Sequence, residues 1–305
     1  MLATKRGRLR ALAVTAVLAA VAFTTGYGAV EPAAPAVAAI GAPATPDAPL
    51  RIDYGSGPDT FGDLYLPAGG TGPYPVVVLI HGGSWAQYRT LAQFAPQATA
   101  LARQGVAVWN VEYRRVNGAG GWPVTLTDVD DAVTALATVV QQRSGRRLDL
   151  RRVHLAGHSA GGHLAAWVAG RHASPDPAAR RGIRIRSLTV LAGVLDPVLA
   201  VRNGRDGAVR KLLGGGPEEV PERYQEASPI AHLPRGIHVS ALHGEADRVV
   251  DPEQSRRYVA AARAAGNTTD LQLLPGVGHA EFTTPTSSAW ASAFKVVLDN
   301  VERLR

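Results

Sequence analysis

The chain has 305 residues, of which 46% are hydrophobic and 19% charged, with a formal net charge of +7. This composition is typical of a globular protein with a buried core and excludes a disordered chain. The absence of cysteine excludes disulfides, a thiolate nucleophile and a cysteine-ligated metal. The arginines are scattered, with no basic stripe interleaved with aromatic residues, which argues against nucleic-acid binding.

The N-terminal segment has the features of a bacterial export signal. Basic residues precede the uncharged apolar run Ala11–Phe23, and Ala36-Val37-Ala38 fits a small-residue cleavage site. We therefore predict that residues 1–38 are a signal peptide, that the protein is secreted, and that no stable membrane anchor remains. An uncleaved N-terminal anchor is the alternative. A Pro/Ala-rich lead-in follows at residues 39–49.

The remainder, residues 50–305, alternates between strand and helix patterns. Segments 50–54 and 61–67 alternate apolar and polar residues and predict an antiparallel hairpin at a sheet edge. From there the chain predicts, in order, a strand at 75–80, a helix at 91–103, a strand at 106–111, a helix at 127–142, a strand at 153–155, a helix after residue 159, strands at 188–192 and 239–243, a helix at 252–265, a strand at 271–274 and a helix at 287–304. This order predicts one α/β domain with a mostly parallel sheet and helices on both faces.

One segment, residues 196–229, breaks this alternation. It contains Gly214-Gly215-Gly216-Pro217 and only a weak helical pattern. Because it follows a predicted strand, we expect an insertion at the carboxyl edge of the sheet. It either shapes a pocket or is a surface connection without a binding role.

A candidate nucleophile lies between the predicted strand at 153–155 and the helix that follows. Gly157-His158-Ser159-Ala160-Gly161 has the form G-x-S-x-G, in which small neighbours permit a sharp, strained turn that exposes the serine Oγ. A chain with 33 glycines can contain this pattern by chance. The strand-turn-helix context favours a nucleophilic Ser159.

A nucleophilic serine needs a base and an acid, and in an open α/β sheet both come from loops at the carboxyl ends of strands. His279 follows the last predicted strand on a Gly-flanked loop, so it is the predicted base. Asp247 follows the strand before it and is the predicted acid, with Glu245 and Asp251 as rivals on the same loop. The histidines that rival His279 are His81, His154, His158, His163, His172, His232, His238 and His243.

A candidate oxyanion loop follows the strand at 75–80. In His81-Gly82-Gly83-Ser84-Trp85, two glycines let the backbone N–H groups approach a developing oxyanion. The N–H of Ala160, the residue after the candidate nucleophile, is the expected second donor. An ordinary glycine turn is the alternative. Trp85, Tyr88 and Trp122 are candidates for lining a substrate pocket, with core packing as the alternative.

Five motifs carry a family resemblance that extends over nearly all of residues 50–305. The motifs are His81–Trp85, Gly157–Gly162, Ala227–Ile230, His243–Asp247 and Gly276–His279. They resemble the esterase/lipase group of the α/β-hydrolase superfamily, in which the triad has the chain order serine, acid, histidine. The oxyanion motif is similar to the H-G-G-x-W of the kynurenine-formamidase-like and carbohydrate-esterase (feruloyl or acetyl xylan esterase-like) branch.

The resemblance implies a triad of Ser159, Asp247 and His279, with backbone N–H groups of Gly83, Ser84 and Ala160 in the oxyanion hole. It implies a serine esterase, and with the predicted signal peptide we expect a secreted one. We expect a small-molecule or carbohydrate-linked ester as substrate and no metal or organic cofactor. Amide or formamide hydrolysis, kynurenine-formamidase-like or peptidase-like, is the alternative within enzymes. An inactive hydrolase fold that binds a ligand is the alternative outside them.

Overall fold

The computed structural model describes residues 48–173, 182–205 and 207–303. The chain divides into two units, Met1–Gly41 and Ala42–Arg305, and all the described residues belong to the second. The predicted signal peptide and most of the lead-in therefore lie outside the described residues and remain predictions. No helix in the described ranges combines the length and apolar character that crossing a membrane requires.

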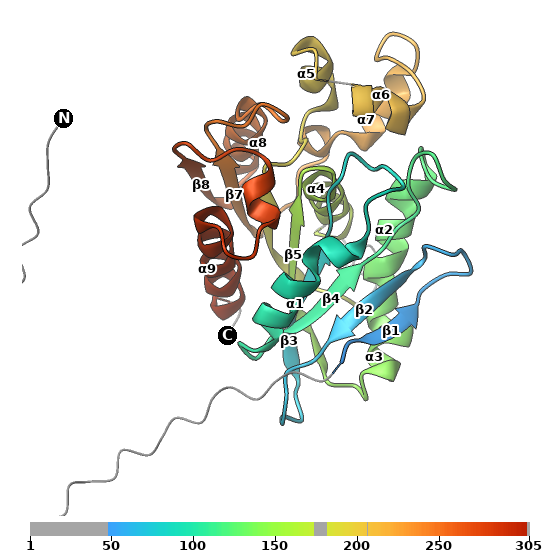
Figure 1. Cartoon of the computed structure of the whole chain (residues 1–305), viewed down its shortest axis with the longest axis vertical. Coiled ribbons are helices and arrows are strands. Elements are labelled where there is room, and N and C mark those ends of the chain that lie inside the picture. Colours follow the sequence, from blue (N-terminus) through green and yellow to red (C-terminus); the bar gives the residue numbers. More distant parts are fainter. Residues whose placement is uncertain (1–47, 174–181, 206, 304–305) are drawn as a thin grey trace, which may run out of the picture. The chain divides into compact units, whose positions relative to one another are not determined.

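A single eight-stranded sheet forms the centre of the described unit (Figure 1). Its strands, in spatial order, are β1 (Leu50–Asp53), β2 (Phe61–Tyr65), β4 (Ala107–Val111), β3 (Tyr74–Ile80), β5 (Leu148–His158), β6 (Ile185–Leu191), β7 (His238–Gly244) and β8 (Thr268–Leu274). β1 and β2 pair antiparallel, β2 joins β4 antiparallel, and all the other neighbours are parallel. The predicted edge hairpin and the mostly parallel sheet are confirmed.

Strand β3 explains why the buried strands are continuously apolar. Successive side chains of a strand point to opposite faces. Val76, Val78 and Ile80 accordingly join one core cluster, while Val77 and Leu79 join the other. A strand with helices on both faces therefore needs apolar residues at every position.

Helices cover both faces of the sheet. In chain order they are η1 (Leu91–Phe94), α1 (Ala95–Ala102), α2 (Val124–Thr134), η2 (Ala135–Ala137), α3 (Val139–Arg143), α4 (Ala160–His172), α5 (Pro197–Arg202), α6 (Gly207–Leu213), α7 (Pro221–Ala227), η4 (Pro229–Ala231), α8 (Glu253–Ala264), η5 (Ala280–Thr283) and α9 (Ser288–Glu302). Buried residues of α2, α4 and α8 belong to one core cluster, and those of α1 and α9 to the other.

Several elements differ from the sequence prediction. β5 extends over Leu148–His158 instead of 153–155, and β6 begins at Ile185 instead of residue 188. The helix expected at 127–142 begins at Val124 and is interrupted at Thr138, whose φ of −122° and ψ of −105° are not helical. The last strand begins at Thr268 instead of Leu271, because this edge strand is half exposed and uses polar residues where the interior strands use apolar ones. The insertion at 196–229 contains three short helices, α5, α6 and α7.

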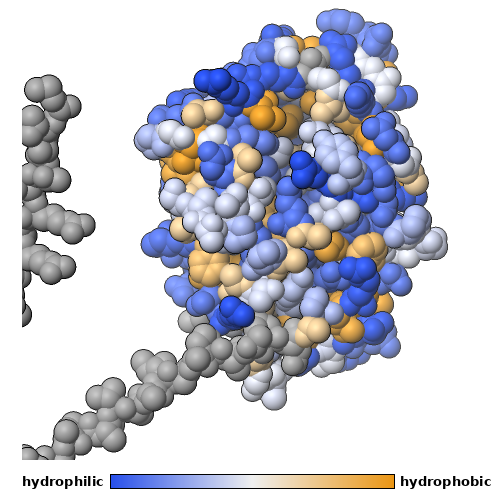
Figure 2. Space-filling view, in the orientation of Figure 1, coloured by the Kyte–Doolittle hydropathy of each residue, from blue (hydrophilic) through white to orange (hydrophobic). Residues whose placement is uncertain are grey.

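The exposed surface is largely polar. Among the described residues the large hydrophobic side chains that are exposed are Tyr88 and Val249. Figure 2 shows one face of the molecule as mainly hydrophilic, with the hydrophobic residues in small scattered patches. The apolar content of the chain is therefore used mainly in the two core clusters.

Candidate active site

Ser159 lies on a sharp turn between β5 and α4, with φ 55° and ψ −119°. Its two glycine neighbours are required by space. A Cβ on Gly157 would lie closer than 3.0 Å to the carbonyl oxygen of Gly161, and one on Gly161 would clash with the carbonyl oxygens of Ile80 and His81. The turn therefore fits closely against the end of β3, and its strained serine stands at the start of α4.

Ser159, His279 and Asp247 form one hydrogen-bonded chain. The Oγ of Ser159 lies 2.8 Å from Nε2 of His279, and Nδ1 of His279 lies 2.7 Å from Oδ2 of Asp247. A carboxylate only accepts hydrogen bonds, so Nδ1 of His279 carries a proton. In a neutral imidazole Nε2 is then free to accept the proton of the serine hydroxyl. The structure thus brings together the three residues that the sequence proposes as a triad.

Asp247 is buried and held by four donors. Its Oδ1 accepts the backbone N–H groups of Val249 and Val250 at 2.8 Å each, and its Oδ2 accepts from His279 and, at 3.3 Å, from His243. Burial raises the pKa of this carboxyl, but the hydrogen bonds from His243 and His279 outweigh burial and hold the pKa well below its ordinary value of 3.8. Asp247 is therefore charged beside His279.

The rival acids have other partners or positions. Oδ2 of Asp251 accepts from the side-chain amide of Asn203 at 2.9 Å, and its Oδ1 accepts the backbone N–H of Glu253. Glu245 is exposed at the surface. Asp247 alone of the three contacts His279 within the described part of the chain.

Three of the rival histidines are buried and uncharged. Burial lowers the pKa of His154 to about 3, of His158 to about 3 and of His163 to about 4. Their imidazoles are therefore neutral at physiological pH and act as hydrogen-bonding core residues. His163 donates from Nε2 to the carbonyl oxygen of Ala227 at 2.8 Å, which joins α4 to the insertion.

The predicted oxyanion loop has three consecutive residues with positive φ: Gly83 at 109°, Ser84 at 58° and Trp85 at 52°. A Cβ at Gly82 would lie 2.7 Å from the carbonyl oxygen of His158, so the loop packs directly on the nucleophile turn. The backbone N–H groups of Gly83, Ser84 and Ala160 meet no acceptor in the described ranges. Unpaired N–H groups beside a serine are what an oxyanion hole requires.

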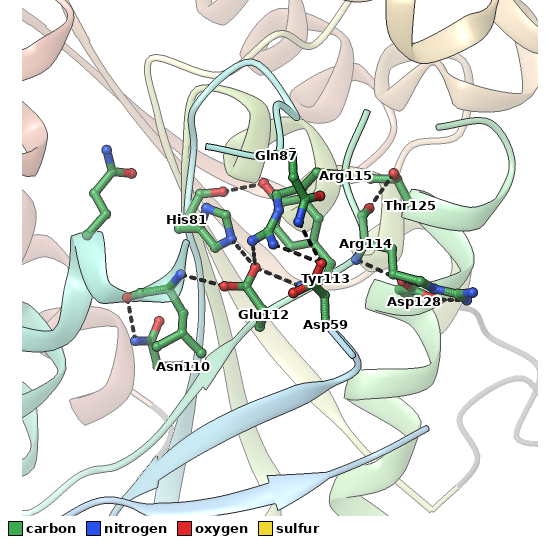
Figure 3. A network of polar contacts seen from close by, with 12 residues as sticks. Asp59, His81, Gln87, Asn110, Glu112, Tyr113, Arg114, Arg115, Thr125 and Asp128 are labelled. Atoms are coloured by element: carbon green, nitrogen blue, oxygen red, sulfur yellow. Dashed lines mark hydrogen bonds and ion pairs between the residues drawn. The ribbon is translucent and has the colours of Figure 1, made fainter. Parts of the chain in front are cut away.

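Buried Glu112 supports the oxyanion loop through contacts with His81 and Leu91 (Figure 3). Its carboxylate accepts from Nε2 of His81 at 2.9 Å and from the backbone N–H of Leu91 at 3.0 Å, so it binds both ends of the loop. It also pairs with the buried guanidinium of Arg115, which forms a second ion pair with Asp59 at 3.1 Å. The charge of Glu112 is therefore compensated inside the protein.

Tyr113 fixes the first residue of the loop. Its ring stacks on the imidazole of His81 with a centroid distance of 4.4 Å. Its hydroxyl donates to the carbonyl oxygen of His81 at 2.9 Å. The backbone that leads into Gly82 is consequently held before any substrate binds.

The three aromatic residues expected to line a substrate pocket lie in different environments. Trp85 is 2% exposed and packs edge-to-face on His163 with a centroid distance of 5.2 Å, in line with the core alternative. Tyr88 is 72% exposed. Trp122 is partly buried against the core cluster, and its backbone N–H donates to the carbonyl oxygen of Leu212 in α6, which ties its loop to the insertion.

Sequence reasoning missed the supporting roles of four residues: His158, His243, Glu112 and Tyr113. Only His243 could have been found from a local pattern, because it stands four residues before Asp247 in the motif His243-Gly-Glu-Ala-Asp247. The others contact the site across long sequence separations, and no local sequence pattern indicates such contacts. In the described ranges, no group of three or more His, Asp or Glu side chains could hold a metal ion.

Several known proteins are similar to this chain. Esterase LipC of Mycobacterium tuberculosis is 29% identical over 285 residues, which cover 84% of this chain and 66% of LipC. A kynurenine formamidase of Salmo salar is 33% identical over 119 residues, 39% of this chain and 37% of that protein. The chain thus spans two thirds or less of the length of these relatives. A truncated carbohydrate esterase from gut microbiota superposes with a TM-score of 0.71 at 20% identity, covering 85% of this chain and 98% of that chain.

The superposition shows the α/β-hydrolase fold, as the sequence predicts. The family model described as BD-FAE matches residues 62–261, from β2 into α8. This match includes the nucleophile turn, the oxyanion loop, the insertion and Asp247, and it covers well over half of the chain. The protein therefore belongs to the BD-FAE family of α/β-hydrolase esterases.

Proposed function

We propose that the protein hydrolyses carboxylic esters through an acyl-enzyme formed on Ser159. The observation that carries the proposal is the chain of hydrogen bonds from Ser159 through His279 to the charged Asp247, at 2.8 and 2.7 Å. Beside this hydrogen-bonded chain lie the backbone N–H groups of the oxyanion loop and of Ala160, which have no acceptor in the described ranges. The similarity to the BD-FAE family and to esterase LipC supports carboxylic esters as the substrate class.

The first half of the reaction forms the acyl-enzyme. The Oγ of Ser159 attacks the ester carbonyl carbon while its proton passes to Nε2 of His279. The electron pair displaced onto the carbonyl oxygen is stabilised by the N–H groups of Gly83, Ser84 and Ala160. Collapse of this intermediate breaks the carbon–oxygen bond to the alcohol, which leaves with the proton held by His279.

The second half releases the acid. Water attacks the acyl carbon and gives a proton to His279, and the oxyanion forms again in the same position. Collapse breaks the bond to Oγ of Ser159, which recovers its proton from the imidazolium. Asp247 remains ionised throughout and stabilises the positive charge that His279 carries in both halves.

Substitution of Ser159 tests this proposal. With p-nitrophenyl esters of short acyl chains, Ser159→Ala is expected to lower kcat by at least about 10³-fold. Ser187→Ala is the matched control, because Ser187 is a buried serine whose Oγ also lies 2.7 Å from an imidazole nitrogen, that of His154. Its activity should stay near wild type. Wild-type activity in folded Ser159→Ala would refute the proposal.

Formamide hydrolysis is a second candidate because of the similarity to kynurenine formamidase. The same chain of residues would serve, with His279 protonating an amine instead of an alcohol. Comparing kcat/KM for N-formylkynurenine, short p-nitrophenyl esters, feruloyl esters and acetylated xylan separates the two. We propose that esters, free or carbohydrate-linked, have the higher value. We also propose secretion, supported by the basic residues and apolar run within residues 1–38.

A further inference from the structure

We propose that His243 is a positioning residue for the catalytic acid, a second histidine that holds Asp247 in the orientation His279 needs. This inference rests on the proposed function. His243 is the penultimate residue of β7 and is fully buried. Its Nε2 lies 3.3 Å from Oδ2 of Asp247, the same oxygen that accepts the proton of His279.

The neighbours of His243 fix where its protons lie. Nε2 faces the carbonyl oxygen of Val250 at 3.1 Å and the carboxylate of Asp247. Both groups only accept, so Nε2 carries a proton. Nδ1 lies 2.7 Å from the hydroxyl of Ser255 in α8, which can supply the other hydrogen bond. The ring is therefore anchored at both nitrogens, and its Nε2–H is shared between the carbonyl oxygen of Val250 and the carboxylate of Asp247.

Asp247 depends on this donor because all its acceptor positions are used. A carboxylate has about four lone-pair sites. Oδ1 is held by the N–H groups of Val249 and Val250, and Oδ2 by His279 and His243. Two donors on each oxygen prevent rotation about the Cβ–Cγ bond. Without His243, Oδ2 would keep one donor in a buried position, and its direction toward His279 would be set less tightly.

The acid loop is also fastened to the loop that carries the base. The N–H of Glu245 donates to the carbonyl oxygen of Leu274, and the N–H of Ala246 donates to that of Val277, each at 3.0 Å. These contacts set the path of the backbone but do not touch the carboxylate of Asp247. The backbone N–H groups of Val249 and Val250 hold only Oδ1, and the side chain of His243 adds a second donor on Oδ2.

Two substitutions separate the donor to Asp247 from the imidazole as packing. Asparagine at position 243 reaches Ser255 but not Asp247, whereas glutamine carries an amide donor about as far as Nε2. We expect His243→Asn to lower kcat for a short p-nitrophenyl ester by about 10- to 100-fold with KM within about twofold of wild type. His243→Gln should recover most of the loss. Phosphonylation of Ser159 by a fluorophosphonate should slow in parallel.

His154→Asn is the matched control. His154 is also fully buried on an interior strand, with Nδ1 2.7 Å from a serine hydroxyl, that of Ser187, but its Nε2 has no partner in the described ranges. The same change there should leave kcat within about twofold of wild type. Thermal melting of all three variants shows whether each is folded at the assay temperature.

A measurement on the unsubstituted protein keeps the test valid if a variant fails to fold. The imidazole ¹⁵N spectrum should show His243 with a protonated, exchange-protected Nε2, and Asp247→Asn should shift that signal but not the signals of His154. A folded His243→Asn with wild-type kcat, equal losses in the Asn and Gln variants, or an unprotonated Nε2 would each overturn the proposal. Ser159→Ala is assayed alongside, because retained activity there refutes the catalytic serine instead.

Discussion

Nε2 of His158 lies 3.0 Å from the backbone carbonyl oxygen of His279. His158, which precedes the proposed nucleophile, therefore holds the loop that carries the proposed base, 121 positions away in the sequence. The two imidazole rings lie against each other with a centroid distance of 4.6 Å. Because burial, and then the neighbouring His279, lower the pKa of His158 to about 3, this contact is a neutral hydrogen bond at working pH.

Removing the Nε2 donor of His158 should leave the imidazole of His279 less firmly positioned. We expect His158→Leu to lower kcat by about tenfold, since a displacement of the base by a fraction of an ångström disturbs its contact with Ser159. His158→Gln, which keeps an amide donor of similar reach, should lose much less. Steady-state kinetics on both variants test this. Equal activity in the two would show that the hydrogen bond has no role.

The buried neutral histidines should make the fold sensitive to acid. In the unfolded chain a histidine takes up a proton near pH 6.5, whereas His154, His158 and His163 have native pKa values of about 3 to 4. Between these values the unfolded state binds more protons, so stability falls as the pH falls from 6.5 toward 4. Each group contributes about 1.4 kcal/mol per pH unit over that window.

Urea unfolding at pH 7.5 and at pH 5 measures this loss of stability. His154→Asn removes one of the three groups, so its free energy of unfolding should fall by about 2 kcal/mol less than that of wild type over the same interval. Equal losses in wild type and variant would contradict the account.

Glu112 should contribute more to the free energy of unfolding than an exposed ion pair does. Glu112→Ala leaves the buried Arg115 with a single counter-ion and removes an acceptor from both His81 and Leu91. We expect a loss of about 3 to 5 kcal/mol in the free energy of unfolding. Arg51→Ala is the control: it breaks an ion pair in which the arginine is 59% exposed and should cost at most about 1 kcal/mol. Similar costs would show that the Glu112 cluster is not a structural support.

Glycine substitutions test the close fit of the nucleophile turn. Gly161→Ala would place a methyl group against the carbonyl oxygens of Ile80 and His81, so we expect a folding defect of several kcal/mol or no soluble protein. Gly207, at the start of α6, has open space around its Cβ position. Gly207→Ala should therefore be neutral or stabilising by up to about 1 kcal/mol. A melting temperature near wild type for Gly161→Ala would contradict the structure.

The sequence predicts the interior of this fold better than its edges. The strand at 75–80 can be predicted because a strand covered on both faces must be apolar throughout, and β3 confirms the prediction. The edge strand β8 begins with Thr268, Thr269 and Asp270, which read as a loop until the partner strand β7 is known. The insertion has only a weak pattern because helices of six or seven residues bury too few positions to show a period.

The candidate site is predictable where its residues lie in local motifs. Ser159 is indicated by its flanking glycines, and His279 and Asp247 by their places after strands. The supporting contacts are not predictable in this way. His158 reaches His279 and Glu112 reaches His81 across the fold, so their pairing depends on strand order. The position of Trp85 close to the oxyanion glycines suggests a pocket-lining side chain. The structure shows instead that Trp85 is buried and packs on His163.

Mapping the site of covalent labelling by a fluorophosphonate tests the central claim most directly. Trypsin releases the peptide Val153–Arg171, in which Ser159 is the only serine and which contains no threonine or tyrosine. Attack by Oγ of Ser159 on phosphorus expels fluoride, so mass spectrometry should find one stoichiometric adduct, on this peptide. Ser159→Ala should remain unlabelled. An adduct on another peptide, or folded wild-type protein that takes up no label, would contradict Ser159 as the nucleophile.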